Sequence, residues 1–457
     1  MIRFAGLAAI PVAFLLATTS FAQQSDQPLL KGEAAFGDWH ADRPGVRRLI
    51  RPEDLHAPFV TESASNGPGL AERPEDAKLQ LPPGFSAEMI ASGIGNPRVV
   101  RVAPNGDLFV ANSQADQIRL YRLAEGSAQP ARKAIFARNL NRPYGITFYP
   151  PGDNPEWVYV ANSDGVVRFP YRNGDLKASG NPETIVSNIP SNGHWTRDIA
   201  FSPDGKTLYM SVGSLSNVAE SMEKEPDGGL DAWVKSKPLG ATWGYEDGRA
   251  NVLAFDPDGK NGHIVATGLR NCSGMTVQPA TGALWCVVNE RDQLGDNLPF
   301  EYATTVKQGA FYGWPWYYIG NNEDPRHEGE RPDLAGKATI PDVLMQAHSA
   351  PLNIAFYDGR NFTAESSFPA EYQGDAFVAL HGSWNRGIRT GYKVVRLRFR
   401  DGKPTGEYED FITGFVVSNA AVWGRPVGVA VANDGALIVT EDGSGSIWRV
   451  TYGQGRS

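Results

Sequence analysis

Six short stretches of the chain repeat one pattern of apolar and polar positions. Each combines a short alternating apolar run, a turn built on Gly with Pro, Asn or Asp, and a second alternating run. The first runs begin near Val100, Ile146, Ile199, Met275, Ile354 and Val429. Alternation with period two on both sides of a Gly-containing turn is typical of an antiparallel hairpin. Since one hairpin cannot bury its apolar face alone, the repeat predicts sheets stacked in a closed ring, an all-β six-bladed β-propeller.

The propeller is expected to occupy residues 81–457. Because the chain after the last unit holds only about three strands, a strand over residues 85–90 (FSAEMI) is predicted to complete the last blade and close the ring. Residues 23–80 are rich in Pro, Glu, Asp and Arg and show little periodicity, which predicts an extended N-terminal arm packed on the propeller. The alternative is a β-sandwich or a pair of smaller β domains, but sandwiches do not repeat one hairpin six times.

Composition and charge narrow the class of protein. With 50 Gly and 33 Pro among 457 residues, the chain suits a turn-rich β fold. The net charge of −8 argues against a nucleic-acid partner, because phosphate binding requires a basic surface. Residues 1–22 carry Arg3, an apolar stretch and a final Ser-Phe-Ala, which predicts a cleavable signal peptide and export to a periplasm or beyond. The alternative, a membrane anchor, would need a longer apolar run, and no later segment is apolar enough to cross a bilayer.

The chain has two cysteines, Cys272 and Cys286, which flank the turn of the fourth unit. In an oxidising compartment two nearby thiols tend to pair, so a disulfide across this hairpin is expected. The cysteines lack the spacing of a c-type haem attachment site.

Cationic side chains stand just ahead of the six first strands. In a propeller these strands line the central channel, so the loops before them open onto one face near the axis. The candidate cofactor-binding cations in these loops are Arg98, Arg142, Arg197, His348 and Arg425, with His194 and Arg270 as catalytic candidates. Any one of these arginines alone would be interpreted as a solvated loop residue or as a fork that binds backbone carbonyls. Because an Arg or His stands ahead of the first strand of all six blades, the set instead predicts a positive pocket on the axis for a small polyanionic ligand.

The second strands return to the same face, and their exits are polar. The fourth exit places Glu290, Asp292, Asp296 and Asn297 in one Gly-containing loop, and clustered hard oxygen ligands favour Ca²⁺; the alternative is a polar loop without a metal. Asp442, at the sixth exit, joins the cofactor-binding candidates. His194 is a candidate general base, against the alternative of a structural loop histidine.

Several stretches together resemble the soluble, pyrroloquinoline quinone (PQQ) dependent sugar dehydrogenases, and among them the L-sorbosone dehydrogenase branch. The resemblance covers residues 81–452 and is carried by GHWTRDIAFSPDGKTLYMSVGSLSN, GLRNCSGMTVQPATGALW, NERDQLGDNLP, YGWPWYYIG, HSAPLNIAFY, LHGSWNRG, GYKVVRL and GRPVGVAV, with GDWHADRPGVRRLIRPEDL in the arm. It implies a six-bladed propeller that holds PQQ, a tricarboxylate, in its axial pocket. The expected polyanion agrees with that cofactor.

The resemblance also implies roles for individual residues. His194 matches the family's catalytic base, Arg270 and Asn271 match an Arg-Asn pair at the quinone oxygens, and Arg425 matches an arginine that pairs with a cofactor carboxylate. The loop containing Glu290, Arg291, Asp292, Asp296 and Asn297 matches the calcium loop, where the family uses backbone carbonyls, and Tyr312 is placed near it. Trp384 and Arg386 fall where the family has a cofactor-contacting lysine.

Two departures from the family pattern stand out. Many members have Asp at the position of Ser214 to orient the catalytic histidine. Asp198 is a candidate substitute, but its place in the apolar alternation argues against that role. The calcium loop lacks the Gly-Pro of the glucose-oxidising members.

The resemblance as a whole implies oxidation of a sugar, a sorbosone-like sugar aldehyde or a polyol, with electrons passed to a separate quinone or cytochrome. The alternatives are a calcium-dependent lactonase and a non-catalytic propeller that binds a glycan or a partner.

Overall fold

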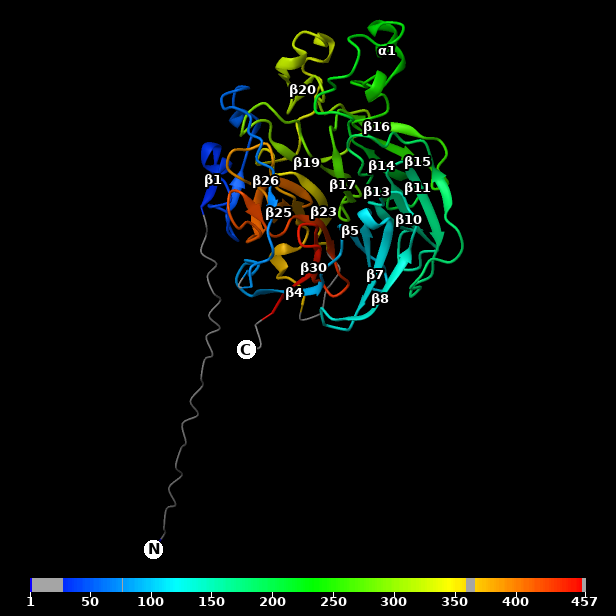
Figure 1. Ribbon diagram of the computed structural model, residues 1–457, viewed down its shortest axis with the longest axis vertical. Helices are drawn as coiled ribbons and strands as arrows, with labels where there is room; N and C mark the ends of the chain where they lie inside the picture. Colours follow the sequence, from blue (N-terminus) through cyan, green and yellow to red (C-terminus); the bar gives the residue numbers. More distant parts are fainter. Residues whose placement is uncertain (2–27, 76, 359–365, 454–457) are drawn as a thin grey trace.

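The computed structural model describes residues 1, 28–75, 77–358 and 366–453 of this chain. Apart from Met1, the predicted signal peptide lies outside the described residues. The described chain forms six antiparallel sheets arranged as the blades of a propeller (Figure 1). The innermost strands of successive blades contact one another around a complete ring, which confirms the predicted six-bladed β-propeller.

Blades 1 to 3 follow one another along the chain, with each blade's innermost strand first. Their strands are β5 (Pro97–Val102), β6 (Leu108–Asn112), β7 (Gln117–Leu123) and β8 (Pro130–Ala137); β9 (Ile146–Tyr149), β10 (Trp157–Asn162), β11 (Gly165–Pro170) and β12 (Glu183–Val186); β13 (Ile199–Phe201), β14 (Leu208–Val212), β15 (Asn251–Phe255) and β16 (His263–Thr267).

Blades 4 to 6 continue the ring. Their strands are β17 (Cys272–Val277), β18 (Leu284–Val288), β19 (Glu301–Thr305) and β22 (Val343–Met345); β23 (Pro351–Phe356), β24 (Ala376–Leu380), β25 (Lys393–Arg400) and β26 (Lys403–Ile412); β28 (Pro426–Val431), β29 (Leu437–Glu441), β30 (Ser446–Tyr452) and β4 (Phe85–Ala91). β4 pairs antiparallel with β30, so the strand predicted over residues 85–90 does complete the last blade. The two ends of the propeller sequence thereby share one sheet, which closes the ring.

The second strands explain why these sequences form blades. β6, β18, β24 and β29 are buried along their whole length, because a strand inside a blade is covered by the neighbouring blade on each face. Their continuous apolar runs therefore pack between sheets. The predicted disulfide is confirmed: Cys272 on β17 is bonded to Cys286 on β18, within the hairpin of blade 4.

The N-terminal arm is built into blade 5. β2 (Arg47–Leu49) pairs with β26 and β1 (Leu29–Lys31) pairs with β2, so blade 5 becomes a six-stranded sheet (Figure 1). Further along the arm, β3 (Gly69–Leu70) pairs with β27 (Ala421–Val422). Four buried charges join arm and blade: Asp42 and Arg48 from the arm, and Lys393 and Asp410 from β25 and β26. Ionic contacts between buried groups at 2.7 to 2.8 Å hold the arm in one position.

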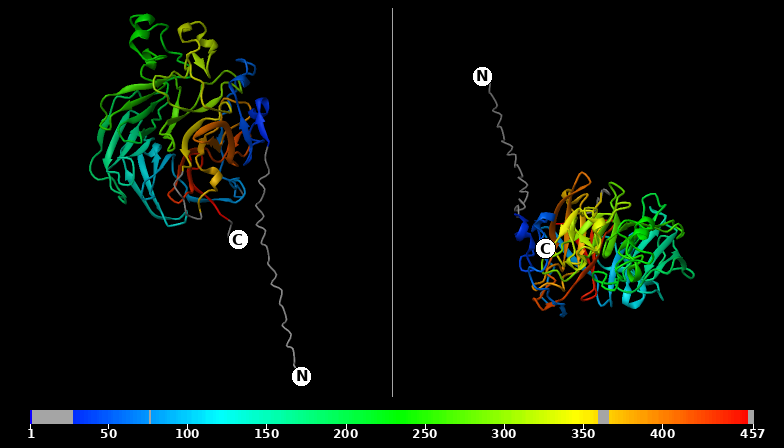
Figure 2. Two further views of the ribbon diagram at one scale, coloured as in Figure 1. Left: turned by 180° about the vertical axis from the view of Figure 1, so that it is seen from behind. Right: turned by 90° about the horizontal axis from the view of Figure 1, so that it is seen from above.

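Two insertions, after β14 and after β19, form a lobe at one end of the molecule. In both views α1 (Leu230–Ser236) and β20 (Tyr317–Tyr318) lie side by side there (Figures 1 and 2). Trp243 from the first insertion packs with Phe311, Trp316 and Leu334 from the second. The remaining short elements are β21 (Asn322–Glu323), η1 (Gly32–Phe36), η2 (Pro52–Asp54), η3 (Ser113–Ala115), η4 (Gly244–Glu246), η5 (Pro325–His327), η6 (Pro332–Leu334) and η7 (Ala370–Tyr372). Within the described ranges, no helix is long and apolar enough to cross a membrane.

Candidate active site

His194 lies in the loop before β13, the innermost strand of blade 3. It is therefore on the face of the propeller where the innermost strands begin. Its Nδ1 is 2.9 Å from the Ser214 carbonyl oxygen and 3.0 Å from Ser214 Oγ. Because a carbonyl oxygen only accepts, Nδ1 carries the proton and donates it there. The tautomer leaves Nε2 unprotonated, and the described residues supply no hydrogen bond to that atom. An imidazole held in this way has a proton acceptor, Nε2, that the described residues leave free.

The charge state of His194 follows from its surroundings. Burial lowers its pKa to about 3, and the positive charges of Arg270 and Arg197 act in the same direction. The imidazole is therefore neutral at neutral pH. Arg197 holds the loop that carries it, donating to the carbonyls of His194 and Thr196, each at 2.7 Å, and to that of Pro190. These contacts occupy Arg197, which is fully buried, so the structure contradicts its prediction as a cofactor-binding cation.

Arg270 precedes β17 and is fixed by the surrounding backbone. Its Nε donates to the Asn217 carbonyl at 3.0 Å, and its guanidinium donates to the carbonyls of Asn289 and Glu290 at 3.2 and 2.9 Å. Asn217 Oδ1 accepts from Arg270 at 3.1 Å and from the Asp292 N–H at 2.8 Å. Asn217 thus holds Arg270 and the Asp292 backbone together, a role that no pattern in the sequence predicted. It lies in the insertion after β14, where no alternation marks a functional position.

Asp292 and His348 complete this side of the site. His348 Nε2 lies 2.9 Å from the Gly295 carbonyl, and its Nδ1 lies 3.3 Å from Asp292 Oδ1. Burial opposes ionisation of Asp292, but contacts with His348 and Arg270 outweigh it and lower its pKa below the ordinary value. Asp292 is thus an ionised carboxylate between His348 and Arg270, as its 3.5 Å approach to the guanidinium also indicates.

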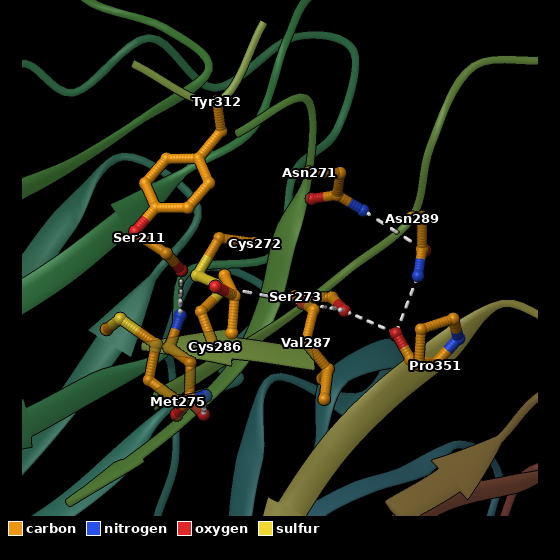
Figure 3. Close-up of a disulfide and its surroundings, with 12 residues drawn as sticks. Ser211, Asn271, Cys272, Ser273, Met275, Cys286, Val287, Asn289, Tyr312 and Pro351 are labelled. Carbon is orange, nitrogen blue, oxygen red and sulfur yellow. Dashed lines mark hydrogen bonds between the residues drawn. A yellow bond between two sulfur atoms is a disulfide. The ribbon is translucent and has the colours of Figure 1, made fainter. Parts of the chain in front are cut away.

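Asn271 lies beside Arg270, above the disulfide (Figure 3). Its amide nitrogen donates to Asn289 Oδ1 at 3.4 Å, and Asn289 in turn donates to the Pro351 carbonyl at 2.5 Å. Asn271 Oδ1 is buried without a hydrogen-bond partner among the described residues. Gly213 allows this packing, because a Cβ there would come within 2.5 Å of Asn271 Oδ1 and 2.6 Å of His194 Cβ. The site therefore keeps an unsatisfied amide oxygen next to the imidazole.

A second charged group comes from blades 1, 5 and 6. Arg98 donates to Asp442 Oδ2 at 2.5 Å, and His381 Nε2 donates to Asp442 Oδ1 at 2.7 Å. Burial would raise the pKa of Asp442, but His381 and Arg98 bring it well below the ordinary value. Burial lowers the pKa of His381 to about 4, so this imidazole is neutral. His381 directly follows β24, the second strand of blade 5, and nothing in the sequence marked it as a partner for Asp442.

Arg425 adds positive charge to this group. Its Nε reaches the His381 carbonyl at 3.4 Å, while its terminal nitrogens have no hydrogen-bond partner among the described residues. Burial lowers the pKa of Arg425. The charges of Arg98 and Arg389 lower it further, whereas the charge of Asp442 raises it. Arg98 and Arg425 thus share one carboxylate, that of Asp442. The resulting excess of buried positive charge fits an anionic ligand such as a carboxylate.

Aromatic rings connect the two groups. The Arg98 guanidinium lies 5.5 Å from the Tyr144 ring and 5.6 Å from the Trp195 ring, and Arg142 lies 4.1 Å from Trp195. Trp195 directly follows His194, so the cations of blades 1 and 2 border the loop that carries the candidate base. Arg142 is exposed.

The side chains predicted to bind calcium do not gather into a metal site among the described residues. None of their His, Cys, Asp and Glu side chains gather in a group of three or more that could hold a metal ion. Arg291 is fully buried and bonded to Glu290, Asp324 and the carbonyls of Pro315 and Tyr317. Arg291 therefore ties the loop to the lobe.

The rest of that loop is also engaged. Asp296 accepts from the Gly387 N–H at 3.0 Å, and Asn297 Oδ1 accepts from Arg386 at 2.9 Å. Loop carbonyls accept from cationic or amide groups: those of Asn289 and Glu290 from Arg270, and that of Asp292 from Asn217 and Arg326. Guanidinium and amide groups thus already donate to several of the loop oxygens that a calcium ion would use, whereas Glu290 Oε1 is buried without a hydrogen-bond partner among the described residues.

Of three other predicted residues, Tyr312 and Arg386 donate to backbone carbonyls and Trp384 is exposed. Tyr312 donates to the Thr305 carbonyl, at the far end of β19 from the loop, beside the disulfide (Figure 3). Arg386 donates to the carbonyls of Phe36 and Gly37 in the arm. Trp384 is 44% exposed. Arg386 therefore joins the arm to the fourth exit loop, and the structure contradicts a direct cofactor contact for it.

The fold and this site define a class: six-bladed propellers with a neutral histidine and several cationic side chains in the loops of one face. The chain belongs to the TrAA12-like family, which matches residues 79–308 and 324–453. It is 23% identical over 431 residues to a pyrroloquinoline quinone-dependent pyranose dehydrogenase of Coprinopsis cinerea, covering 81% of this chain and 54% of that protein. The chain thus spans about half the length of that relative.

Solved structures show the same fold. The PQQ domain of pyranose dehydrogenase from Coprinopsis cinerea, in its holo form, superposes with a TM-score of 0.65 at 22% identity, covering 84% of this chain and 99% of that one. A Trichoderma reesei protein of the carbohydrate-active enzymes family AA12 gives a TM-score of 0.66 at 19% identity, covering 85% and 100%. The propeller of this chain is therefore equivalent to a whole domain of these proteins.

Proposed function

We propose that this protein is a PQQ-dependent dehydrogenase that oxidises a sugar, a sugar aldehyde such as sorbosone, or a polyol. The observation that carries the proposal is the arrangement of His194, with an unprotonated Nε2, next to Arg270 and Asn271 in a positive pocket. Membership of the TrAA12-like family and the names of its relatives support the choice of PQQ and of a sugar.

The residues present fit a polyanionic cofactor. Arg425 offers free terminal nitrogens, and Arg98 adds positive charge, so both would pair with cofactor carboxylates. The unsatisfied Asn271 Oδ1 and the amide of the same side chain would orient a polar ring edge. When bound, PQQ would supply the acceptor for a hydride from the substrate carbon.

His194 and Arg270 perform the protein's part of the chemistry. Nε2 of His194 would take the proton of the substrate hydroxyl, and an aldehyde would react as its hydrate, which provides such a hydroxyl. The proton would remain on the imidazole, whose Nδ1–H stays donated to Ser214. Arg270 would stabilise the negative charge that develops in the pocket, since its guanidinium is held rigidly by Asn217 and the Asn289 and Glu290 carbonyls.

Electrons would leave to an external acceptor, a quinone or a separate cytochrome, and the protein would act in a periplasm or outside the cell. The amino-terminal export pattern and the disulfide support that location. Calcium binding remains a prediction without a role in this proposal, because the described side chains do not form a site for it.

The test is reconstitution. Purified cofactor-free protein is mixed with PQQ, with and without Ca²⁺, and dye reduction is followed with aldoses, sorbosone and polyols. We expect turnover with at least one of these classes, loss of turnover in His194→Ala with PQQ binding retained, and no change in His263→Ala, an exposed histidine on β16. Absence of both turnover and bound quinone would refute the proposal.

A further inference from the structure

A short loop, residues 214–216, holds the imidazole of His194 by hydrogen bonds to Nδ1. Ser214 contacts Nδ1 through both its carbonyl and its hydroxyl, at 2.9 and 3.0 Å. Ser214 Oγ donates its own proton to the Ser216 carbonyl at 2.7 Å, so towards His194 it acts as an acceptor. The orientation and tautomer of His194 therefore depend on where this loop is held.

Glu246 holds that loop. Its carboxylate accepts from the Leu215 N–H at 2.8 Å, from the Ser216 N–H at 3.0 Å and from Ser216 Oγ at 2.7 Å. Glu246 is 1% exposed and belongs to η4, in the insertion after β14. A carboxylate that accepts three hydrogen bonds from two successive residues fixes their backbone more firmly than a neutral acceptor would.

The described structure has no carboxylate in contact with the His194 imidazole. Asp198, the substitute considered from the sequence, accepts from Arg101 at 2.9 and 3.0 Å and from the Met275 N–H at 2.8 Å, so it belongs to the packing of the innermost strands. Asp292 acts on His194 only through its charge, together with the opposing charges of Arg270 and Arg197. The carboxylate nearest in the hydrogen-bond chain is Glu246, separated from the ring by Ser216 and Ser214.

We infer that Glu246 is a positioning residue for His194, acting through the Ser216 and Ser214 hydrogen bonds in place of a carboxylate directly on the imidazole. The inference rests on the proposed function, because it assigns to His194 the part of the base. Through this chain the lobe insertion sets the direction of Nε2 and keeps the proton on Nδ1. The imidazole gains orientation from Glu246 without an ion pair.

The test compares Glu246→Gln with Glu225→Gln, a matched change of an exposed glutamate in the same insertion. Glutamine offers one acceptor oxygen where three donors converge, and its amide protons face the Ser216 or Leu215 donors. We expect kcat to fall by about ten-fold to about a hundred-fold, as for an active group displaced by a fraction of an ångström, with KM and the Kd for PQQ within about two-fold of wild type. Glu225→Gln should match wild type.

A spectroscopic measurement reports on His194 without turnover. In cofactor-free protein labelled with ¹⁵N-histidine, the imidazole ¹⁵N shifts distinguish the Nδ1–H from the Nε2–H tautomer, and His194→Gln assigns the signals. We expect one tautomer, protonated at Nδ1, in wild type and in Glu225→Gln, and a mixture in Glu246→Gln. If the wild-type protein oxidises no sugar, the proposed function fails, while these spectra still test the link from Glu246 to His194.

Three results would overturn the inference: unchanged kcat in Glu246→Gln, an unchanged tautomer, or a loss of kcat that tracks a loss of PQQ affinity. If Glu246→Gln does not fold, Ser216→Ala replaces it. This variant removes one of the three hydrogen bonds to Glu246 and keeps the two from backbone N–H groups. A tautomer identical to wild type in Ser216→Ala, together with an unchanged kcat, would then refute the chain.

Discussion

Arg425→Ala tests the positive pocket directly. In the structure this side chain makes one long hydrogen bond, 3.4 Å to the His381 carbonyl, and has no carboxylate of its own. Its removal should therefore cost the fold little. A hydrogen bond to a charged group contributes about 1.5 to 3 kcal/mol, so loss of the Arg425 pairing with a cofactor carboxylate should raise the Kd for PQQ by about ten-fold to about 150-fold.

The assay is a calorimetric titration of cofactor-free protein with PQQ at fixed ionic strength. Arg138→Ala, at an exposed arginine after β8, controls for the loss of one positive charge and should leave Kd unchanged. Arg425→Lys keeps the charge but loses the planar fork, and should fall between wild type and Arg425→Ala. If Arg425→Ala binds PQQ as tightly as wild type with an unchanged melting temperature, the pocket does not bind the cofactor through Arg425.

Three further outcomes follow from the fold and the charges. Replacing Cys272 and Cys286 by Ala should lower the free energy of unfolding by about 3 kcal/mol, as expected for a closed loop of this length (sequence separation 14), measured by chemical denaturation; no loss would contradict this. Asp410→Asn, which breaks the buried contacts to the arm, should cost about 3 to 5 kcal/mol in the same assay, whereas exposed Asp227→Asn should cost almost nothing. Burial lowers the folded-state pKa of His194 from 6.5 to about 3, so the unfolded chain takes up the proton first as the pH drops. The free energy of unfolding should therefore fall as the pH drops from 6.5 to about 3. His194→Gln should lessen that slope, and an equal slope in this variant would refute the prediction.

Most of the architecture could be predicted because it is encoded locally. Each hairpin has its alternating runs and its turn within a short segment, and the disulfide joins two strands of one hairpin. Closure by residues 85–90 followed from the shortage of strands after Val429. The extension of blade 5 by β1 and β2 could not be predicted, because strands of three residues carry no readable period.

The site was predictable in part. The rule that loops before the innermost strands share one face predicts that His194, Arg270, Asn271 and Arg425 lie on the same face. The rule says nothing about which way a side chain turns. Arg197 and Arg291 occupy similar loops, yet both turn into the protein and bind carbonyl oxygens, because the guanidinium offers five donors that a tight loop can use.

The sequence by itself determined the ring of blades and the face on which charged loops gather, since both depend on periodicity and on the direction of each strand. Only the tertiary structure decided which cations stay free for a ligand and which serve the fold. It also decided that a carboxylate 30 residues beyond Ser216 in the same insertion, Glu246, supports His194 where Asp198 does not. The physical reason is that hydrogen bonds form between groups brought together by packing, and the separation of Glu246 from Ser216 along the chain carries no sign of that contact.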